Sequence, residues 1–239
     1  MELLNVIKAR SVWLFDINDL NPRGKAVFPE LIEWLKDNYS FSKVPASPAD
    51  YDETKALAFL DGHFQVKEEI FISVDLRIYS DGLIADCRSS TADSDEFLMD
   101  VMDSAKQEFT LAYGSDIRRR TVYGSELTVR SERNLNALNA HLTEFCARLS
   151  ALTNTQSRAP FETFGISFAL DPSTPTGLLQ FKIERKINTP LSEGRYYSIA
   201  PLKTEEHLAL LDEFEGLLLP ETEHGGGQQH ATRKILLED

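Results

Sequence analysis

Three residues in the second half of the chain loosely match the pattern of a metal-dependent nuclease. Asp171, Glu184 and Lys186 fit the arrangement D…ExK, in which two carboxylates hold a divalent metal and a lysine helps to activate water. If Asp171 lies at the loop end of a hairpin, Glu184 lies about six or seven residues along the partner strand, roughly 20 Å away. We therefore favour a charged, exposed strand that resists aggregation, and keep the nuclease as an alternative.

Other side chains that could do chemistry lack partners. No motif for phosphate, dinucleotide, zinc-protease or serine-hydrolase chemistry occurs, and the five histidines have no metal-ligand spacing. Cys87 and Cys146 fall on apolar faces and are interpreted as small core residues. Asp16 and Asp86 are the acids expected nearest to the core, but neither has a general acid–base partner in the sequence. We expect no metal and no cofactor, and favour a non-enzymatic role.

Three tyrosines and a glutamate are the candidates for a ligand site. Tyr123, Glu126, Tyr196 and Tyr197 would line a groove between two halves of the chain, since related repeats often hold ligands at their interface. The alternative, which we favour, is that the tyrosines cover the edge of the core and keep their hydroxyl groups in water.

The composition describes a folded, acidic protein. Its 239 residues are 42% hydrophobic and 26% charged, the net charge is −13, and no apolar run is long enough to span a bilayer. Residues 1–116 carry 22 acidic and 11 basic side chains, whereas residues 117–239 carry 16 and 14. This charge opposes non-specific binding to nucleic acid. Two cysteines do not make a disulfide framework, so we expect a cytoplasmic protein.

Two segments are candidates for docking a protein partner. Their residues are Arg118, Arg119, Arg120, Ile235, Leu236 and Leu237. The arginine run is the densest positive stretch, and a solvated strand entry is the simpler explanation for it. The apolar triplet follows a polar, glycine-rich stretch and fits either a frayed terminus or a tethered docking peptide. An acidic face bearing Asp95, Asp100 and Asp103 offers a weaker alternative, the imitation of nucleic acid.

The hydrophobic pattern predicts strands and helices in the first half in the order β-α-β-β-β-α. The expected elements are strands at residues 10–17, 56–60, 70–78 and 83–87, a helix from Phe28 and a helix capped by Asp93. The dipeptide Asp61-Gly62 is expected to end the second strand, and a helix capped by Gly62 is the alternative for that segment.

The second half repeats this order of elements. The expected elements are strands at residues 121–130, 164–170, 179–183 and 195–200, one helix over residues 135–152 and a last helix capped at Thr204. Leucines and one phenylalanine recur at three- and four-residue steps along the first of these helices, which predicts a buried seam about five turns long.

These elements predict an α+β fold made of two pseudo-symmetric β-α-β-β-β-α repeats. Each repeat would form an antiparallel sheet with helices packed on one face. The expected units are residues 1–116, residues 117–219 and a flexible tail at residues 220–239. The element order resembles that of TATA-binding-protein-like repeats and, more loosely, of duplicated ferredoxin-like modules, but the residues carry no motif of either family. Fold alone does not imply function.

The leading functional hypothesis is a non-enzymatic interaction or scaffold subunit of a larger intracellular complex. A more specific version makes it an accessory component of a prokaryotic defence or mobile-element system. The alternatives are a module that binds a small ligand between the repeats, and the metal-dependent nuclease described above.

Overall fold

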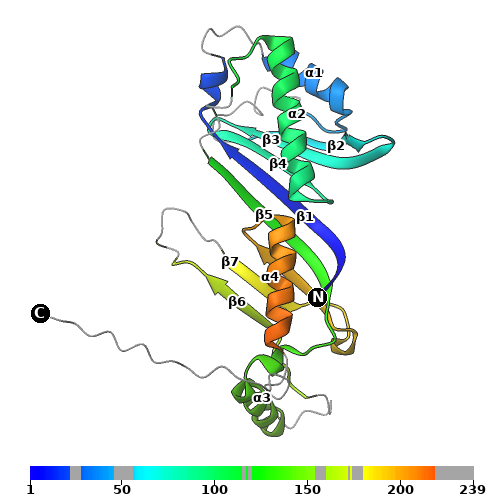
Figure 1. The fold of residues 1–239 in the computed structure, drawn as a ribbon, viewed down its shortest axis with the longest axis vertical. Coiled ribbons are helices and arrows are strands. Elements are labelled where there is room, and N and C mark those ends of the chain that lie inside the picture. Colours follow the sequence, from blue (N-terminus) through cyan, green and yellow to red (C-terminus); the bar gives the residue numbers. More distant parts are fainter. Residues whose placement is uncertain are drawn as a thin grey trace, which may run out of the picture.

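The computed structural model describes residues 1–21, 28–45, 56–114, 117, 120–153, 160–171, 173 and 180–218. In these residues, an antiparallel sheet of eight strands has the order β2-β3-β4-β1-β5-β8-β7-β6 (Figure 1). The strands are β1 (Glu2–Leu14), β2 (Leu57–Lys67), β3 (Ile70–Tyr79), β4 (Gly82–Cys87), β5 (Arg120–Arg130), β6 (Gly165–Ala169), β7 (Gln180–Arg185) and β8 (Arg195–Ala200). The helices are α1 (Phe28–Tyr39), α2 (Thr91–Phe109), α3 (Ala140–Leu152) and α4 (Thr204–Leu217), with short 3-10 turns η1 (Ile17–Leu20), η3 (Leu135–Leu138) and η4 (Leu191–Glu193).

The α+β class is confirmed, but the expectation of two separate sheets is wrong. The first strand of each half, β1 and β5, lies at the edge of its own four strands. The two strands pair with each other, antiparallel, from Glu2 opposite Arg130 to Leu14 opposite Arg120. This pairing satisfies the backbone groups of two long edges that would otherwise be exposed, and it joins the halves into one sheet.

Helices α2 and α4 lie across the same face of the sheet, and α3 lies beyond its end (Figure 1). The buried apolar side chains of β1, β4, β5 and β8 point toward this helix-covered face, whereas the buried polar residues Asp86 and Thr128 lie on the other face. In the described part of the chain no helix covers the opposite face, which we call the helix-free face. None of the described helices is long and apolar enough to cross a lipid bilayer.

The core of the first half is built around aromatic rings. Phe97 of α2 is fully buried and contacts the rings of Tyr39 and Phe64 edge-on or tilted, with centroids 5.1 and 5.4 Å away. Phe41 and Phe59 extend the cluster at a centroid distance of 5.4 Å. Such a cluster combines large buried area with favourable ring geometry, so it anchors α1 and α2 to the sheet.

Two strands of the first half begin or end at other residues than predicted. The first strand occupies Glu2–Leu14 rather than residues 10–17, because its partner β5 continues the ladder toward the N-terminus. Asp61 and Gly62 do not end a strand. They lie in a bulge of β2, between the pairs at Phe59 and Gly62, and Asp61 takes the left-handed conformation that such irregularities require (φ 55°).

Helix caps also differ from the prediction. The side chain of Ser90, not Asp93, caps α2 by accepting a hydrogen bond from the Asp93 amide at 3.1 Å. Residue Lys203 precedes α4, and Thr204 is its first residue rather than its cap. Serine is about as favourable as aspartate at this position, so residue preference does not distinguish Ser90 from Asp93.

The long helix predicted over residues 135–152 is wrong. Asn139 has an extended backbone, separates η3 from α3, and caps α3 by accepting the His141 amide at 2.8 Å. The predicted seam is therefore broken. Leu135 is buried, whereas Phe145 and Leu152 are 63% and 73% exposed, because α3 lies beyond the sheet instead of across it.

Candidate interaction surfaces

The three residues of the nuclease pattern lie at separate places. Glu184 is opposite Gly165 in the β6–β7 ladder, while Asp171 follows the other end of β6, roughly 20 Å along the hairpin. Glu184 pairs with Lys182 at 2.7 Å, and Lys186 donates to the Thr128 hydroxyl at 3.3 Å. Among the described residues no three acidic, histidine or cysteine side chains are placed to hold a metal ion.

Asp171 is held by a local turn. It accepts hydrogen bonds from the amide and the hydroxyl of Ser173 at 2.9 and 2.7 Å, and these bonds lower the pKa of its carboxyl group. This arrangement stabilises a local turn and does not bring the carboxylate toward Glu184.

The four residues proposed for a ligand groove are divided between the two faces of the sheet. Tyr197 donates to Glu126 at 2.8 Å on the helix-free face. Tyr196 is fully buried on the helix-covered face and donates to the backbone oxygen of Arg133 at 2.8 Å. Tyr123 also faces the helices, where its hydroxyl lies 3.3 Å from Asp95 of α2. The structure brings two of the four together.

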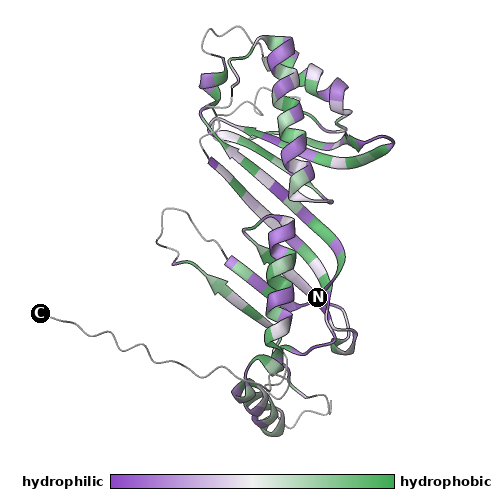
Figure 2. Ribbon diagram, viewed as in Figure 1, coloured by the Kyte–Doolittle hydropathy of each residue, from purple (hydrophilic) through white to green (hydrophobic). Residues whose placement is uncertain are grey.

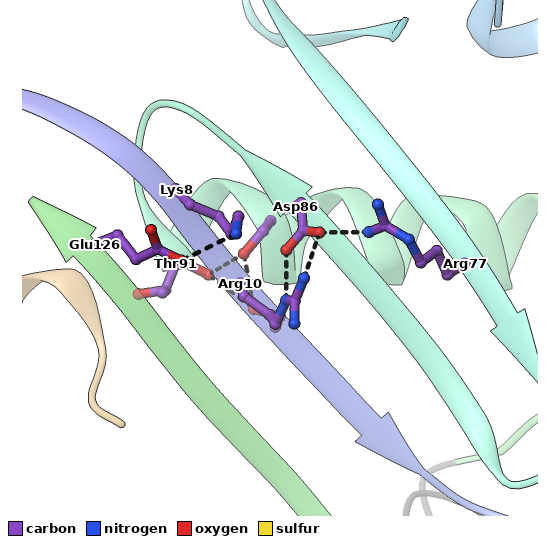
Figure 3. Close-up of polar contacts among 8 residues, drawn as sticks. Lys8, Arg10, Arg77, Asp86, Thr91 and Glu126 are labelled. Carbon is purple, nitrogen blue, oxygen red and sulfur yellow. Dashed lines mark hydrogen bonds and ion pairs between the residues drawn. The ribbon is translucent and has the colours of Figure 1, made fainter. Parts of the chain in front are cut away.

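A charged network crosses the helix-free face where the two halves meet (Figure 3). Asp86 of β4 accepts hydrogen bonds from Arg10 of β1 at 2.6 and 2.8 Å and from Arg77 of β3 at 2.5 Å. Next to it, Lys8 donates to Glu126 across the β1–β5 junction at 2.9 Å. Each cation has a carboxylate partner, so the network stabilises the junction and offers little unpaired charge to a ligand.

The carboxylates of this network are held in the charged form. Burial alone would raise the pKa of Asp86, but the hydrogen bonds and charges of Arg10 and Arg77 outweigh it and hold that pKa below its usual range. Burial likewise opposes ionisation of Glu126, and Lys8 and Tyr197 overcome it, so its pKa is also lowered. The Tyr197 pKa is raised, first by burial and then by Glu126.

A polar hollow of about 520 Å³ lies at the far end of β5. Arg130, Arg133, Glu162 and Arg185 are among its lining residues. Arg185 is almost fully buried; it donates to Glu162 at 2.9 Å and to the Leu191 carbonyl at 3.0 Å. Its Nε is a buried atom without a hydrogen-bond partner among the described residues.

Several large apolar side chains of α3, of β6 and of the residues beside β6 are exposed. They are Phe145, Leu152, Phe161, Phe164, Phe168 and Leu170, and we call them the apolar end surface. Residues 160–164, which precede β6, are held in place by hydrogen bonds from two amides: Phe161 to the Ser150 hydroxyl and Thr163 to the Asn136 side chain, at 2.8 and 2.7 Å. Figure 2 shows β6 in neutral to hydrophobic colours at the edge of the sheet. The exposure is thus a feature of ordered elements.

The remaining docking candidates are only partly described. Arg118, Arg119, Ile235, Leu236 and Leu237 lie outside the described residues. Arg120 begins β5 and is exposed. Of the three acids proposed to imitate nucleic acid, Asp95 accepts a hydrogen bond from the Trp13 indole at 2.6 Å and Asp100 accepts one from Tyr39 at 2.7 Å. These two carboxylates therefore serve the core packing of α2.

The cysteines and the remaining acid occupy structural positions. Cys87 and Cys146 are free and buried. The expectation that Asp16 lies near the core is wrong: it is exposed and caps η1 by accepting the Asn18 amide at 2.9 Å. Among the residues that the structure describes, none of the three adjoins a second group suited to proton transfer.

One row of buried, hydrogen-bonded side chains was not predicted from the sequence. His207 is fully buried between Ser125 of β5, 2.7 Å from its Nδ1, and Ser198 of β8, 2.8 Å from its Nε2. Burial lowers the pKa of His207 to about 4. A signal was present, since His207, Leu211, Phe214 and Leu218 recur at four-, three- and four-residue steps and form the buried stripe of α4.

Comparison with known proteins leaves the geometry as the sole guide to function. No protein-family model matches the chain, and a search of curated proteins finds no significantly similar sequence.

Proposed function

We propose that this protein is a non-enzymatic interaction subunit that binds a protein partner through the apolar end surface. The observation that carries this proposal is the exposure of large side chains on ordered elements: Leu152 is 73% exposed, Phe145 63% and Phe168 56%. Exposed large apolar side chains on a folded protein favour an interaction site, because leaving them in water forfeits stabilisation that a partner recovers.

The charge of the rest of the molecule fits this role. The net charge is −13, which keeps the free chain soluble despite the apolar surface. In the described part of the chain, the charged groups of the network on the helix-free face are paired with one another, as Asp86 is with Arg10 and Arg77. Binding without chemistry is the function that accounts for both features.

We also infer that the scaffold is a pair of related repeats. In each half the first strand pairs with the fourth, the fourth with the third and the third with the second. At the junction, the amide of Thr91 donates to the Thr204 hydroxyl at 3.0 Å, and the amide of Thr204 donates to the Thr91 hydroxyl at 2.9 Å. These threonines begin α2 and α4, so their exchange of hydrogen bonds supports a two-fold relation between the halves.

A second pair of contacts supports the same relation. The fourth residue of α2, Ser94, lies 2.8 Å from Ser11 of β1. The fourth residue of α4, His207, lies 2.7 Å from Ser125 of β5. In both halves a serine of the first strand therefore bonds to the first turn of the last helix.

Capture of partners by matched variants tests the interaction role. Tagged wild-type protein, Leu152→Glu and the control Phe71→Glu are used to capture proteins from the native host. Phe71 is 60% exposed on β3, far along the sheet from α3. We expect a stoichiometric partner with the wild type and the control that is lost with Leu152→Glu. The same proteins with all three samples would contradict the proposal.

The polar hollow favours a second candidate, the binding of a small anionic ligand. Arg185 Nε needs an acceptor, and Arg133 lines the same space; guanidinium groups are suited to carboxylate or phosphate. Melting temperatures with citrate and phosphate test this function. A rise that disappears in Arg133→Ala but persists in the exposed control Arg88→Ala supports it. No rise with either anion argues against it.

A further inference from the structure

Strand β6 is an edge of the sheet with an unusual composition. Residues 163–170 (TFGISFAL) carry no charge and no proline, and Phe164, Phe168 and Leu170 are each at least half exposed. Natural edge strands are generally protected by charges, prolines, bulges or covering segments, because a free edge pairs with other chains. In the described residues β6 has none of these protections.

The opposite edge of the same sheet is protected. Strand β2 contains register shifts near Gly62 and near Lys67, and it carries charged side chains. Lys43 covers its outer side, where the Leu60 amide donates to the Lys43 carbonyl at 2.9 Å. The comparison within one molecule indicates that the openness of β6 is a specific feature of that edge.

The backbone of β6 determines which groups a partner strand would meet. The Arg185 amide donates to the Phe164 carbonyl at 2.7 Å, so residue 164 directs its backbone groups toward β7. Because this direction alternates along a strand, Gly165, Ser167 and Ala169 direct theirs outward. An added antiparallel strand must bond to these three residues.

We propose that β6 pairs with β6 of a second copy of this chain, antiparallel about a two-fold axis at Ser167. This inference rests on the proposed function and names the partner at one part of the apolar end surface. In this register Gly165 lies opposite Ala169 of the other copy, so all outward backbone groups of the three residues are paired.

The side chains are self-complementary in the same register. Phe164 lies opposite Leu170 of the second copy, and Ile166 lies opposite Phe168. These four apolar residues share one face of the strand, so each apolar side chain gains an apolar neighbour across the axis. No charged residue of the segment opposes a like charge, which removes the usual obstacle to self-pairing.

The acidic charge predicts how this dimer responds to salt. Each copy carries a net charge of −13, so the copies repel each other and salt screens the repulsion. Dimerisation should strengthen as the salt concentration rises. A partner held by ion pairs would respond in the opposite direction.

Sedimentation velocity across a range of protein and salt concentrations tests the proposal. We expect the wild type to dimerise reversibly, and Ser167→Pro to raise the dissociation constant at least about tenfold, since proline removes an outward hydrogen bond at the centre. Phe168→Glu should act in the same direction, whereas Phe71→Glu should not. Circular dichroism checks that each variant is folded, and two β6 variants keep the test valid if one is not.

Single cysteines test the register itself. Ser167→Cys would face its own counterpart with Cα atoms about 5.5 Å apart, within the range of a disulfide bond. Ala169→Cys would lie roughly 13 Å along the strand from its counterpart. We expect mild oxidation to cross-link the first variant and not the second, because the native cysteines are buried.

Two results would overturn the dimer. One is a monomer at every concentration and salt condition. The other is equal cross-linking of the two cysteine variants, which would show pairing without this register. A monomeric protein that still loses a captured partner with Leu152→Glu would overturn self-pairing while the interaction role remained supported.

Discussion

The two halves of the sheet share a strand order but place their aromatic residues differently. In the first half Tyr39, Phe41, Phe59 and Phe97 are buried against one another. In the second half Phe145, Phe161, Phe164 and Phe168 are all more than 40% exposed. Apart from the exposed Phe71, the described part of the first half buries most of its large rings, whereas the second half leaves several comparable rings available for binding.

The last helix of each half shows a second difference. Both α2 and α4 begin at the junction with a buried threonine, and the fourth residue of each contacts a strand serine. That fourth residue is Ser94 in α2 and the titratable His207 in α4. Equivalent positions in similar elements thus differ in how they respond to pH.

The largest effect is expected for Phe97→Ala. Removing this fully buried ring from the aromatic cluster should lower the free energy of unfolding by about 4 kcal/mol. Phe168→Ala should change it by less than about 1 kcal/mol, because that ring is more than half exposed. Urea denaturation measures both values. Similar losses for the two variants would remove the contrast between the halves.

The stability of the junction between the two halves should depend more on Asp86 than on Glu126. Asp86→Asn leaves Arg10 and Arg77 facing each other without a carboxylate and should cost about 3 kcal/mol. Glu126→Gln removes a more exposed pair and should cost about 1 kcal/mol. Denaturation at pH 7 gives both free energies. A larger cost for Glu126→Gln would reverse the ranking of the two pairs.

Low pH should destabilise the second half of the protein before the first. In the unfolded chain a histidine titrates near pH 6.5, and burial lowers the pKa of His207 to about 4. Below pH 6.5 the unfolded chain therefore binds a proton that the folded protein does not, and the free energy of unfolding decreases as the pH falls. The expected loss is about 2 kcal/mol at pH 5.

Hydrogen exchange measured between pH 7 and pH 5 locates this loss. Amides of β5, β8 and α4 should lose protection before those of α2. His207→Gln should flatten the pH dependence, whereas the exposed control His141→Gln should not. Equal loss of protection in both halves would assign the acid response to other groups.

The smallest effects concern the threonines at the junction. Thr91→Val and Thr204→Val each leave one buried amide without its acceptor and should cost about 1 kcal/mol. If the halves are related by a two-fold axis, the two costs should agree closely. A clear inequality in denaturation experiments would weaken the proposed symmetry.

Sequence periodicity identified most elements but not how they associate. The alternation in β3 and the spacing of apolar residues in α2 predicted their type, because each pattern matches one backbone period. The break at Asn139 was missed, since leucine spacing continues across it. The tyrosines were grouped as lining a groove between the halves, yet Tyr196 and Tyr197 are adjacent in one strand and must point to opposite faces.

The sequence by itself determined the α+β class, the order of strands and helices, and an acidic surface, because these follow from local periodicity and composition. Only the tertiary structure decided that β1 and β5 join the halves and that Phe168 is exposed. Each of those outcomes depends on contacts between residues distant in the chain, for which no local pattern codes. The position of β6 at an open edge is the same kind of property, and it is the one on which the proposed dimer depends.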